Sequence, residues 1–288
     1  WGNAGSALAA LLLPGAAILF GWRVALSLAA VPLLVSSIVY WYGVSDVPEG
    51  KVFRRRPIES DYSPWKDRVV IALALAYVAS FGSEICVVSF LPKLFFDRFD
   101  VSPLYAGMYA SLFGILNVVS RPGGGWLADR LGRKAVLLVL LGCIGLGYIG
   151  LSAVSSLAPT VAAVVLTSVF VQAACGAVFA TAPLVSPRDT GRIAGIIGAA
   201  GNVGGIVFPL CFGYGLEWSG GSYAPGFLIL SAAAVAALIA VWRVPLLSAE
   251  TGEDQVGYGF SVGLTQRVPL RGKRRNYAAT RAEGKAVG

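Results

Sequence analysis

The 288-residue chain contains no histidine and one methionine, and charged residues make up only 13% of it. Without histidine the chain lacks the commonest general base and metal ligand. The four cysteines show no Cys-x-x-Cys spacing, so we interpret them as small buried hydrophobic residues: Cys86, Cys143, Cys175 and Cys211. Nucleophile motifs and cofactor-binding loops are also missing from the sequence. It therefore predicts neither an enzyme nor a bound metal or cofactor.

Hydrophobic residues, by contrast, account for 56% of the chain, which is more than a single soluble core of this length can bury. Runs of about eighteen or more mostly apolar residues recur, and each is long enough to cross a bilayer as a helix. The predicted fold class is therefore an all-α polytopic membrane protein. We expect eight spans, at about 1–20, 22–43, 68–95, 104–124, 135–155, 158–182, 192–216 and 224–245.

Polar stretches divide the chain into four parts. Residues 1–43 are expected to hold the last two helices of an N-terminal half, and residues 44–67 a central linker. Residues 68–246 form a six-helix C-terminal half, and residues 247–288 a basic tail that we expect to be disordered. The only methionine is Met108 and the chain starts within an apolar run. We therefore expect further helices to precede this sequence.

Basic residues gather in alternate loops. Most lie in the linker, in the loops after the fourth and sixth spans, and in the tail. Four of the 23 basic residues lie elsewhere: Arg23, Lys93, Arg98 and Arg121. By the positive-inside rule the basic loops, the linker and the tail face the cytoplasm of a plasma or inner membrane. The net charge of +8 orients the chain in this way, so a nucleic-acid partner is not needed to explain it.

Arg121 belongs to the stretch "SRPGGGWLADRLGRK" at residues 120–134. It lies eight residues before Asp129, which places it about 12 Å, or roughly two helical turns, inside an apolar segment. A permanent cation is expensive there and is by default a functional candidate. A guanidinium can donate two parallel hydrogen bonds to a flat, singly charged oxyanion such as nitrate. Alternatively, Arg121 extends to the cytoplasm or pairs with Asp129.

The stretch "GWLADRLGRK" matches the pattern G-x-x-x-D-R-x-G-R-K and resembles the signature loop of the major facilitator superfamily. We expect its glycines to allow close packing and a tight turn. Its carboxylate would accept hydrogen bonds from a helix N-terminus or from Arg133. An ordinary basic cytoplasmic loop is the alternative. The predicted gating residues are Gly125, Asp129, Arg130, Gly132, Arg133 and Lys134.

The stretches "RPGGGWLADR", "AGIIGAAGNVGG", "WGNAG" and "YVASFGSE" resemble the nitrate/nitrite porter family within that superfamily. The resemblance implies that Arg121 holds the anion, with a second arginine supplied by the N-terminal half. It also implies that Tyr77 and Phe81, one turn apart, line the nitrate pocket. Aromatic residues are common in membrane helices, so chance also explains this pair.

The glycine-rich run around Asn202 resembles the nitrate signature of that family, and this makes Gly198 and Gly201 candidate site residues. Gly195, Gly198, Asn202 and Gly205 share one helix face, where a neighbouring backbone can approach and the Asn202 amide can meet an anion. The pentapeptide "GNVGG" at 201–205 echoes "GNAGS" at 2–6, which places Asn3 at the corresponding position of the other half. Alternatively, these glycines and asparagines serve helix packing alone.

Glu84 is an intramembrane carboxylate with no lysine nearby in the sequence, and such a residue is a functional candidate. We expect Glu84 to take part in proton coupling or to pair with a base in the missing half. A structural, hydrogen-bonded carboxyl group is the alternative.

Together these features predict a secondary transporter that carries nitrate, or nitrite, by alternating access between two six-helix bundles. Import of an anion against a negative interior costs about 2.3 kcal/mol per charge per 100 mV. Net uptake therefore requires symport with protons, which Glu84 favours, or exchange for nitrite. The expected partners are nitrate or nitrite, protons and the lipid bilayer. The alternatives are a major facilitator carrier of another small anion or a drug, and a nitrate-binding sensor without transport.

Overall fold

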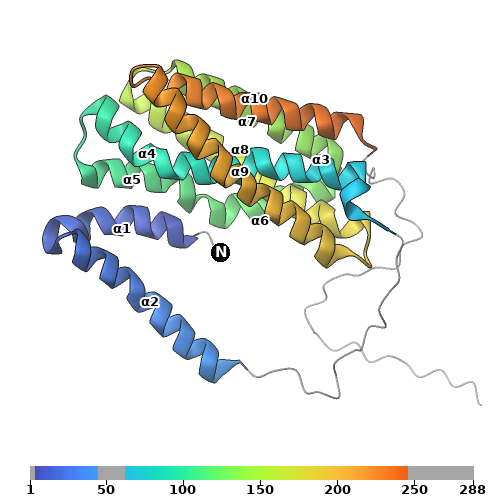
Figure 1. Ribbon diagram of the computed structural model, residues 1–288, viewed down its shortest axis with the longest axis horizontal. Helices are drawn as coiled ribbons and strands as arrows, with labels where there is room; N and C mark the ends of the chain where they lie inside the picture. Colours follow the sequence, from blue (N-terminus) through green and yellow to red (C-terminus); the bar gives the residue numbers. More distant parts are fainter. Residues whose placement is uncertain (1–3, 45–61, 246–288) are drawn as a thin grey trace, which may run out of the picture. The chain divides into compact units, whose positions relative to one another are not determined.

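The computed structural model describes residues 4–44 and 62–245 (Figure 1). Within these ranges the regular structure is entirely helical, as the sequence predicts. The predicted site residue Asn3, most of the linker and the predicted disordered tail lie outside the described residues. The helices run α1 (Ala4–Phe20), α2 (Trp22–Gly43), η2 (Pro64–Lys66), α3 (Arg68–Tyr77), η3 (Val78–Gly82), α4 (Ser83–Phe99), α5 (Pro103–Ile115), α6 (Asn117–Leu131), α7 (Arg133–Ala153), α8 (Leu157–Val185), α9 (Thr190–Trp218) and α10 (Ala224–Arg243).

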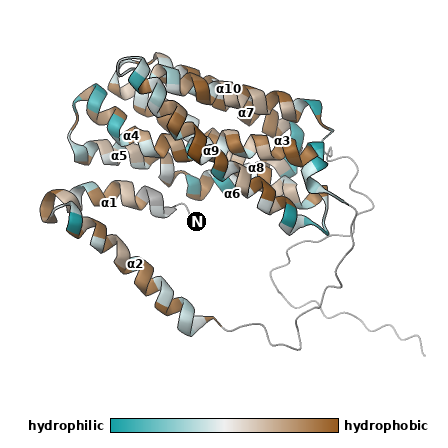
Figure 2. Cartoon of the chain, in the orientation of Figure 1, coloured by the Kyte–Doolittle hydropathy of each residue, from teal (hydrophilic) through white to brown (hydrophobic). Residues whose placement is uncertain are grey.

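Seven helical segments in the described residues are long and apolar enough to cross a membrane. Hydrophobic residues cover most of each helix, whereas hydrophilic residues interrupt α6 (Figure 2). Helices α3, η3 and α4 together form one span, as do α5 and α6. Helix α1 is shorter, at 17 residues, so the first of the eight predicted spans is an apolar helix below the usual spanning length.

The fourth span extends further than the predicted 104–124. Helix α6 continues to Leu131, so Gly125, Asp129 and Arg130 lie in the helix and not in a loop. The turn shrinks to Gly132, whose φ of 93° suits a glycine. The prediction failed because residues 126–131 include good helix formers, and charged side chains in the last turn can extend away from the apolar segment.

Close contact between α6 and α8 fixes the position of Arg121. A methyl group on Gly176 of α8 would overlap the Arg121 carbonyl, and one on Gly124 of α6 would overlap the Ala173 backbone. The hydroxyl of Ser168, also on α8, donates a hydrogen bond to the Phe113 carbonyl of α5. Small residues thus allow these membrane helices to pack backbone to backbone.

Helix α9 crosses η3 at a pair of glycines. A methyl group on Gly82 would lie 2.9 Å from the Gly204 backbone, which is closer than packed carbon atoms approach. The close contacts of α9 differ in part from the predicted face, because none of the described residues lies within 4 Å of a methyl group added to Gly195 or Gly198. The face that packs closely carries Gly201, Gly204 and Gly205, where an added methyl group would clash with α3, η3 or α4.

The Gly132 turn lies at one end of the bundle. Hydrogen bonds of side chains at this end join distant parts of the chain. The Lys134 ammonium donates hydrogen bonds to the carbonyls of Trp242, at 2.9 Å, and Val244, at 2.7 Å, which satisfies the end of α10. Asp67 caps α3 by accepting from the Val69 amide and also accepts from the Tyr62 hydroxyl. Burial and this hydrogen bond raise the pKa of Tyr62 above its ordinary value, so the phenol remains a donor.

Candidate functional site

A buried ion pair joins α4 to α6 in the middle of the bundle. The Arg121 Nη2 atom lies 2.8 Å from Oε2 of Glu84, and the side chains are 24% and 6% exposed, respectively. Asn117 donates a hydrogen bond from Nδ2 to the other carboxylate oxygen at 3.4 Å. Glu84 therefore has a basic partner within the described C-terminal helices, whereas one expectation from the sequence was a base in helices that precede this chain. The alternative pairing of Arg121 with Asp129 is wrong.

Aromatic rings form a wall beside this pair. The Arg121 Cζ atom lies 5.6 Å from the centre of the Phe81 ring, a distance typical of a cation–π contact. The Tyr77 ring stacks on Phe81 with centres 5.0 Å apart and meets Phe179 of α8 edge-on at 4.9 Å. The rings border the guanidinium on this side.

The π turn η3 sits between the aromatic residues and Glu84. Such one-residue expansions of a helix occur frequently at functional sites. Two buried hydroxyls support it, because Ser80 donates to the Ala76 carbonyl and Ser83 donates to the Ala79 carbonyl. Ser83 also accepts a hydrogen bond from the buried Tyr148 hydroxyl of α7 at 2.8 Å. These bonds hold the backbone from which Glu84 projects.

Gly201 is the part of the predicted α9 signature that reaches the site. A methyl group there would lie 2.6 Å from Cε1 of Tyr77 and 3.1 Å from Cδ1 of Phe81, so only glycine lets both rings lie against α9. Asn202 instead has an exposed side chain and donates to the Gly198 carbonyl of its own helix at 2.9 Å. The structure thus groups Arg121, Tyr77, Phe81 and Gly201, and leaves Asn202 and Gly198 on the open face of α9.

The signature motif lies apart from this group, at the Gly132 turn. Arg133 Nη2 contacts Asp129 Oδ1 at 2.7 Å, one of the two partners expected from the sequence. The Arg130 guanidinium covers the Trp126 ring at 4.7 Å.

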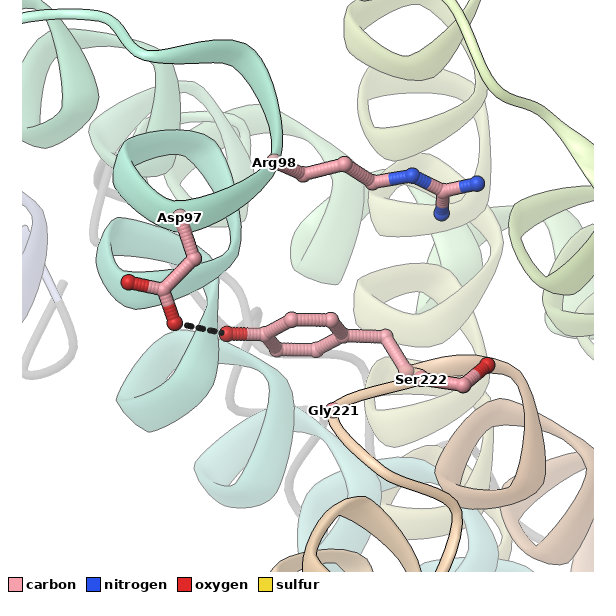
Figure 3. A pocket seen from close by; sticks show the side chains of 5 residues that line it. Asp97, Arg98, Gly221 and Ser222 are labelled. Carbon is pink, nitrogen blue, oxygen red and sulfur yellow. Dashed lines mark hydrogen bonds between the residues drawn. The ribbon is translucent and has the colours of Figure 1, made fainter.

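A separate hollow of about 250 Å³ lies at the opposite end of the bundle, between the end of α4 and the turn before α10. Asp97 and Arg98 line it, and their side chains leave α4 in different directions (Figure 3). The Tyr223 hydroxyl donates to Asp97 at 2.9 Å, and burial followed by this bond raises the pKa of Tyr223. Asp97 also pairs with the exposed Lys93. This hollow contains none of the predicted site residues.

Sequence reasoning missed Asn117 and Phe179. Asn117 lies four residues before Arg121, so both side chains share one face of a helix. A polar residue one turn from an intramembrane arginine is a signal that could have identified it. Phe179 gives no comparable signal, because phenylalanine is common in apolar helices and its contact with Tyr77 depends on how α8 packs.

Comparison with known proteins identifies relatives whose names refer to the transport or extrusion of nitrate or nitrite. The chain is 46% identical over 143 residues to the nitrate/nitrite transporter NrtP of Picosynechococcus sp., covering 48% of this chain and 27% of that protein. It is 34% identical over 254 residues to the high-affinity nitrate transporter 2.3 of Oryza sativa, covering 76% and 47%, respectively. It is 28% identical over 246 residues to the nitrite extrusion protein of Bacillus subtilis, covering 83% and 60%. The chain thus spans less than two thirds of each of these proteins.

The profile of the Major Facilitator Superfamily matches residues 1–185 and, in a second alignment, residues 73–261. These matches agree with the signature motif, with the apolar helices of an integral membrane protein and with the expectation that the chain is not an enzyme. The chain belongs to the Major Facilitator Superfamily.

Proposed function

We propose that the protein carries nitrate or nitrite across a membrane by alternating access, with Arg121 as an anion-binding cation of its C-terminal half. The observation that carries this proposal is the largely buried guanidinium at the centre of a membrane helix, bordered by Phe81. The names of the relatives support the choice of anion. A planar fork of donors suits a planar oxyanion, whereas a lysine would offer only a point charge.

The six helical spans of residues 68–246 would move as one unit against the preceding helices, and residues 44–67 would link the two parts. The Gly132 turn, the linker and the tail would lie on the cytoplasmic side of the membrane. Anion binding between arginines of both halves would favour the occluded state, because each half alone leaves its charge without an anion. We place Asn202 and Gly198, on the open face of α9, along the anion path, and Asn3 at the equivalent position of the other half. Import would be driven by protons, because an anion alone moves against the membrane potential.

Counterflow of nitrate in proteoliposomes tests this proposal, using the protein expressed from its complete gene. Arg121→Lys should lower nitrate exchange at least about 100-fold, because lysine cannot donate a parallel pair of hydrogen bonds. The matched control is Arg98→Lys, the same change at an exposed arginine far from the pair, which should exchange at the wild-type rate. Nitrate binding without any exchange by the wild type would instead indicate a sensor, and preferred exchange of organic anions a different carrier.

A further inference from the structure

The carboxylate of Glu84 binds the Arg121 guanidinium, the group to which the proposed substrate would bind. Glu84 contacts Arg121 through one nitrogen, Nη2, at 2.8 Å. The Arg121 Nε atom is buried and makes no hydrogen bond to any of the described residues. The pair is therefore held at a single point, and a buried donor of the same fork remains for a second anion. A planar oxyanion that replaced the carboxylate could use both donors.

The charges around Glu84 make this replacement depend on a proton. Among the described residues, Arg121 on α6 forms an ion pair with Glu84. Other titratable side chains around the pair come from α3, α7 and α8, and phenols and thiols are ordinarily uncharged at neutral pH: Tyr77, Tyr148 and Cys175. With Glu84 ionised the pair is neutral, and a bound nitrate would add one uncompensated negative charge to a largely buried site. Such a charge is strongly unfavourable inside a protein.

From this geometry we propose that Glu84 is an internal counter-anion that a proton displaces from Arg121 when the substrate anion binds. This inference rests on the proposed function. One proton adds to a carboxylate oxygen of Glu84, the Glu84–Arg121 ion pair breaks, and the anion takes over Nη2 together with Nε. The neutral acid can remain hydrogen-bonded to the Asn117 amide, which already contacts Oε1. The site then holds one cation and one anion both before and after binding.

Linkage fixes the sign of the pH dependence. If one proton is taken up with each anion, the anion affinity falls up to tenfold for each unit of rising pH. A neutral amide at position 84 removes the competitor permanently. Glu84→Gln should therefore bind the anion more tightly than the wild type at high pH and lose the pH dependence. A merely structural carboxyl group at this position predicts weaker binding in the same variant.

Nitrate binding to the purified full-length protein, measured calorimetrically at pH 6, 7 and 8, tests the proposal. A pH indicator in weakly buffered solution counts protons. We expect about one proton taken up per nitrate by the wild type at pH 8, and none by Glu84→Gln. The matched control is Asp97→Asn, the same chemical change in the exposed pair with Lys93, which should leave the pH profile unchanged. Thermal melting of each variant checks that it is folded.

The outcomes separate this inference from the proposed function. Nitrate binding that is independent of pH in the wild type, or that is weakened in a folded Glu84→Gln protein, overturns the role of Glu84 and leaves nitrate as the substrate. Absence of nitrate binding by the wild type at every pH overturns both.

Discussion

Two arginine–carboxylate pairs in this chain have almost the same length and very different surroundings. The pair of Glu84 and Arg121 measures 2.8 Å and joins two helices across 37 residues of sequence. The pair of Asp129 and Arg133 measures 2.7 Å and joins residues four apart around the Gly132 turn. The two arginines are similarly buried, at 24% and 20% exposure, whereas the Glu84 side chain is 6% and the Asp129 side chain 54% exposed. The distances alone therefore do not show which pair matters more for stability. The burial of the charges does, because charges attract more strongly, and are costlier to leave unpaired, where water is excluded.

The largest expected effect comes from removing one member of the central pair. Arg121→Met leaves the Glu84 charge without its cation in a dry site, so we expect a loss of about 3 kcal/mol of stability. Arg133→Met, the same change in the exposed pair, should cost at most about 1 kcal/mol. Thermal or denaturant melting in detergent measures both.

The double variant Glu84→Leu, Arg121→Met sharpens this comparison. Replacing both charges by apolar groups should restore most of the lost stability while nitrate transport remains absent. Equal losses in the two single variants would show that the central pair is as well solvated as the surface pair.

An intermediate effect is expected from the helix contact that positions Arg121. Gly176→Ala introduces a methyl group that overlaps the Arg121 carbonyl, so α6 and α8 must separate at a cost of about 1–3 kcal/mol. Gly150→Ala in α7 is the matched control, because none of the described residues lies within 4 Å of a methyl group added there. We expect a lower melting temperature and weaker nitrate binding for the first variant only. Unchanged melting of Gly176→Ala would mean that this contact does not hold the site.

The smallest effect belongs to the surface. Raising the salt concentration to about 1 M shortens the Debye length to about 3 Å and should remove most of the contribution of the exposed pair. The stability difference between the wild type and Arg133→Met should therefore shrink to near zero in high salt. The difference between the wild type and Arg121→Met should persist, because buried charges are screened much less. Melting curves at low and high salt make this comparison directly.

The sequence was sufficient to place most of the helices and to find an arginine inside one of them, because apolar length and an out-of-place cation are local signals. It was insufficient for the partner of Arg121. Glu84 and Arg121 are far apart in sequence, and their meeting depends on the π turn and on the close approach of α6 to α8. The predicted packing face of α9 differs from the observed one for another reason. Glycines occupy both faces of that helix, so their spacing does not indicate which face meets α3 and η3.

The π turn also has a consequence for insertions and deletions. Each residue of an α-helix advances the side chains by about 100° around the axis. A π turn takes up one residue more than an ordinary turn without redirecting the side chains that follow it. Removing one residue between Val78 and Gly82 should therefore restore an ordinary helix and leave Glu84 facing α6. Removing one residue from the ordinary turns of α3 would instead rotate Glu84 by that angle relative to the start of the helix.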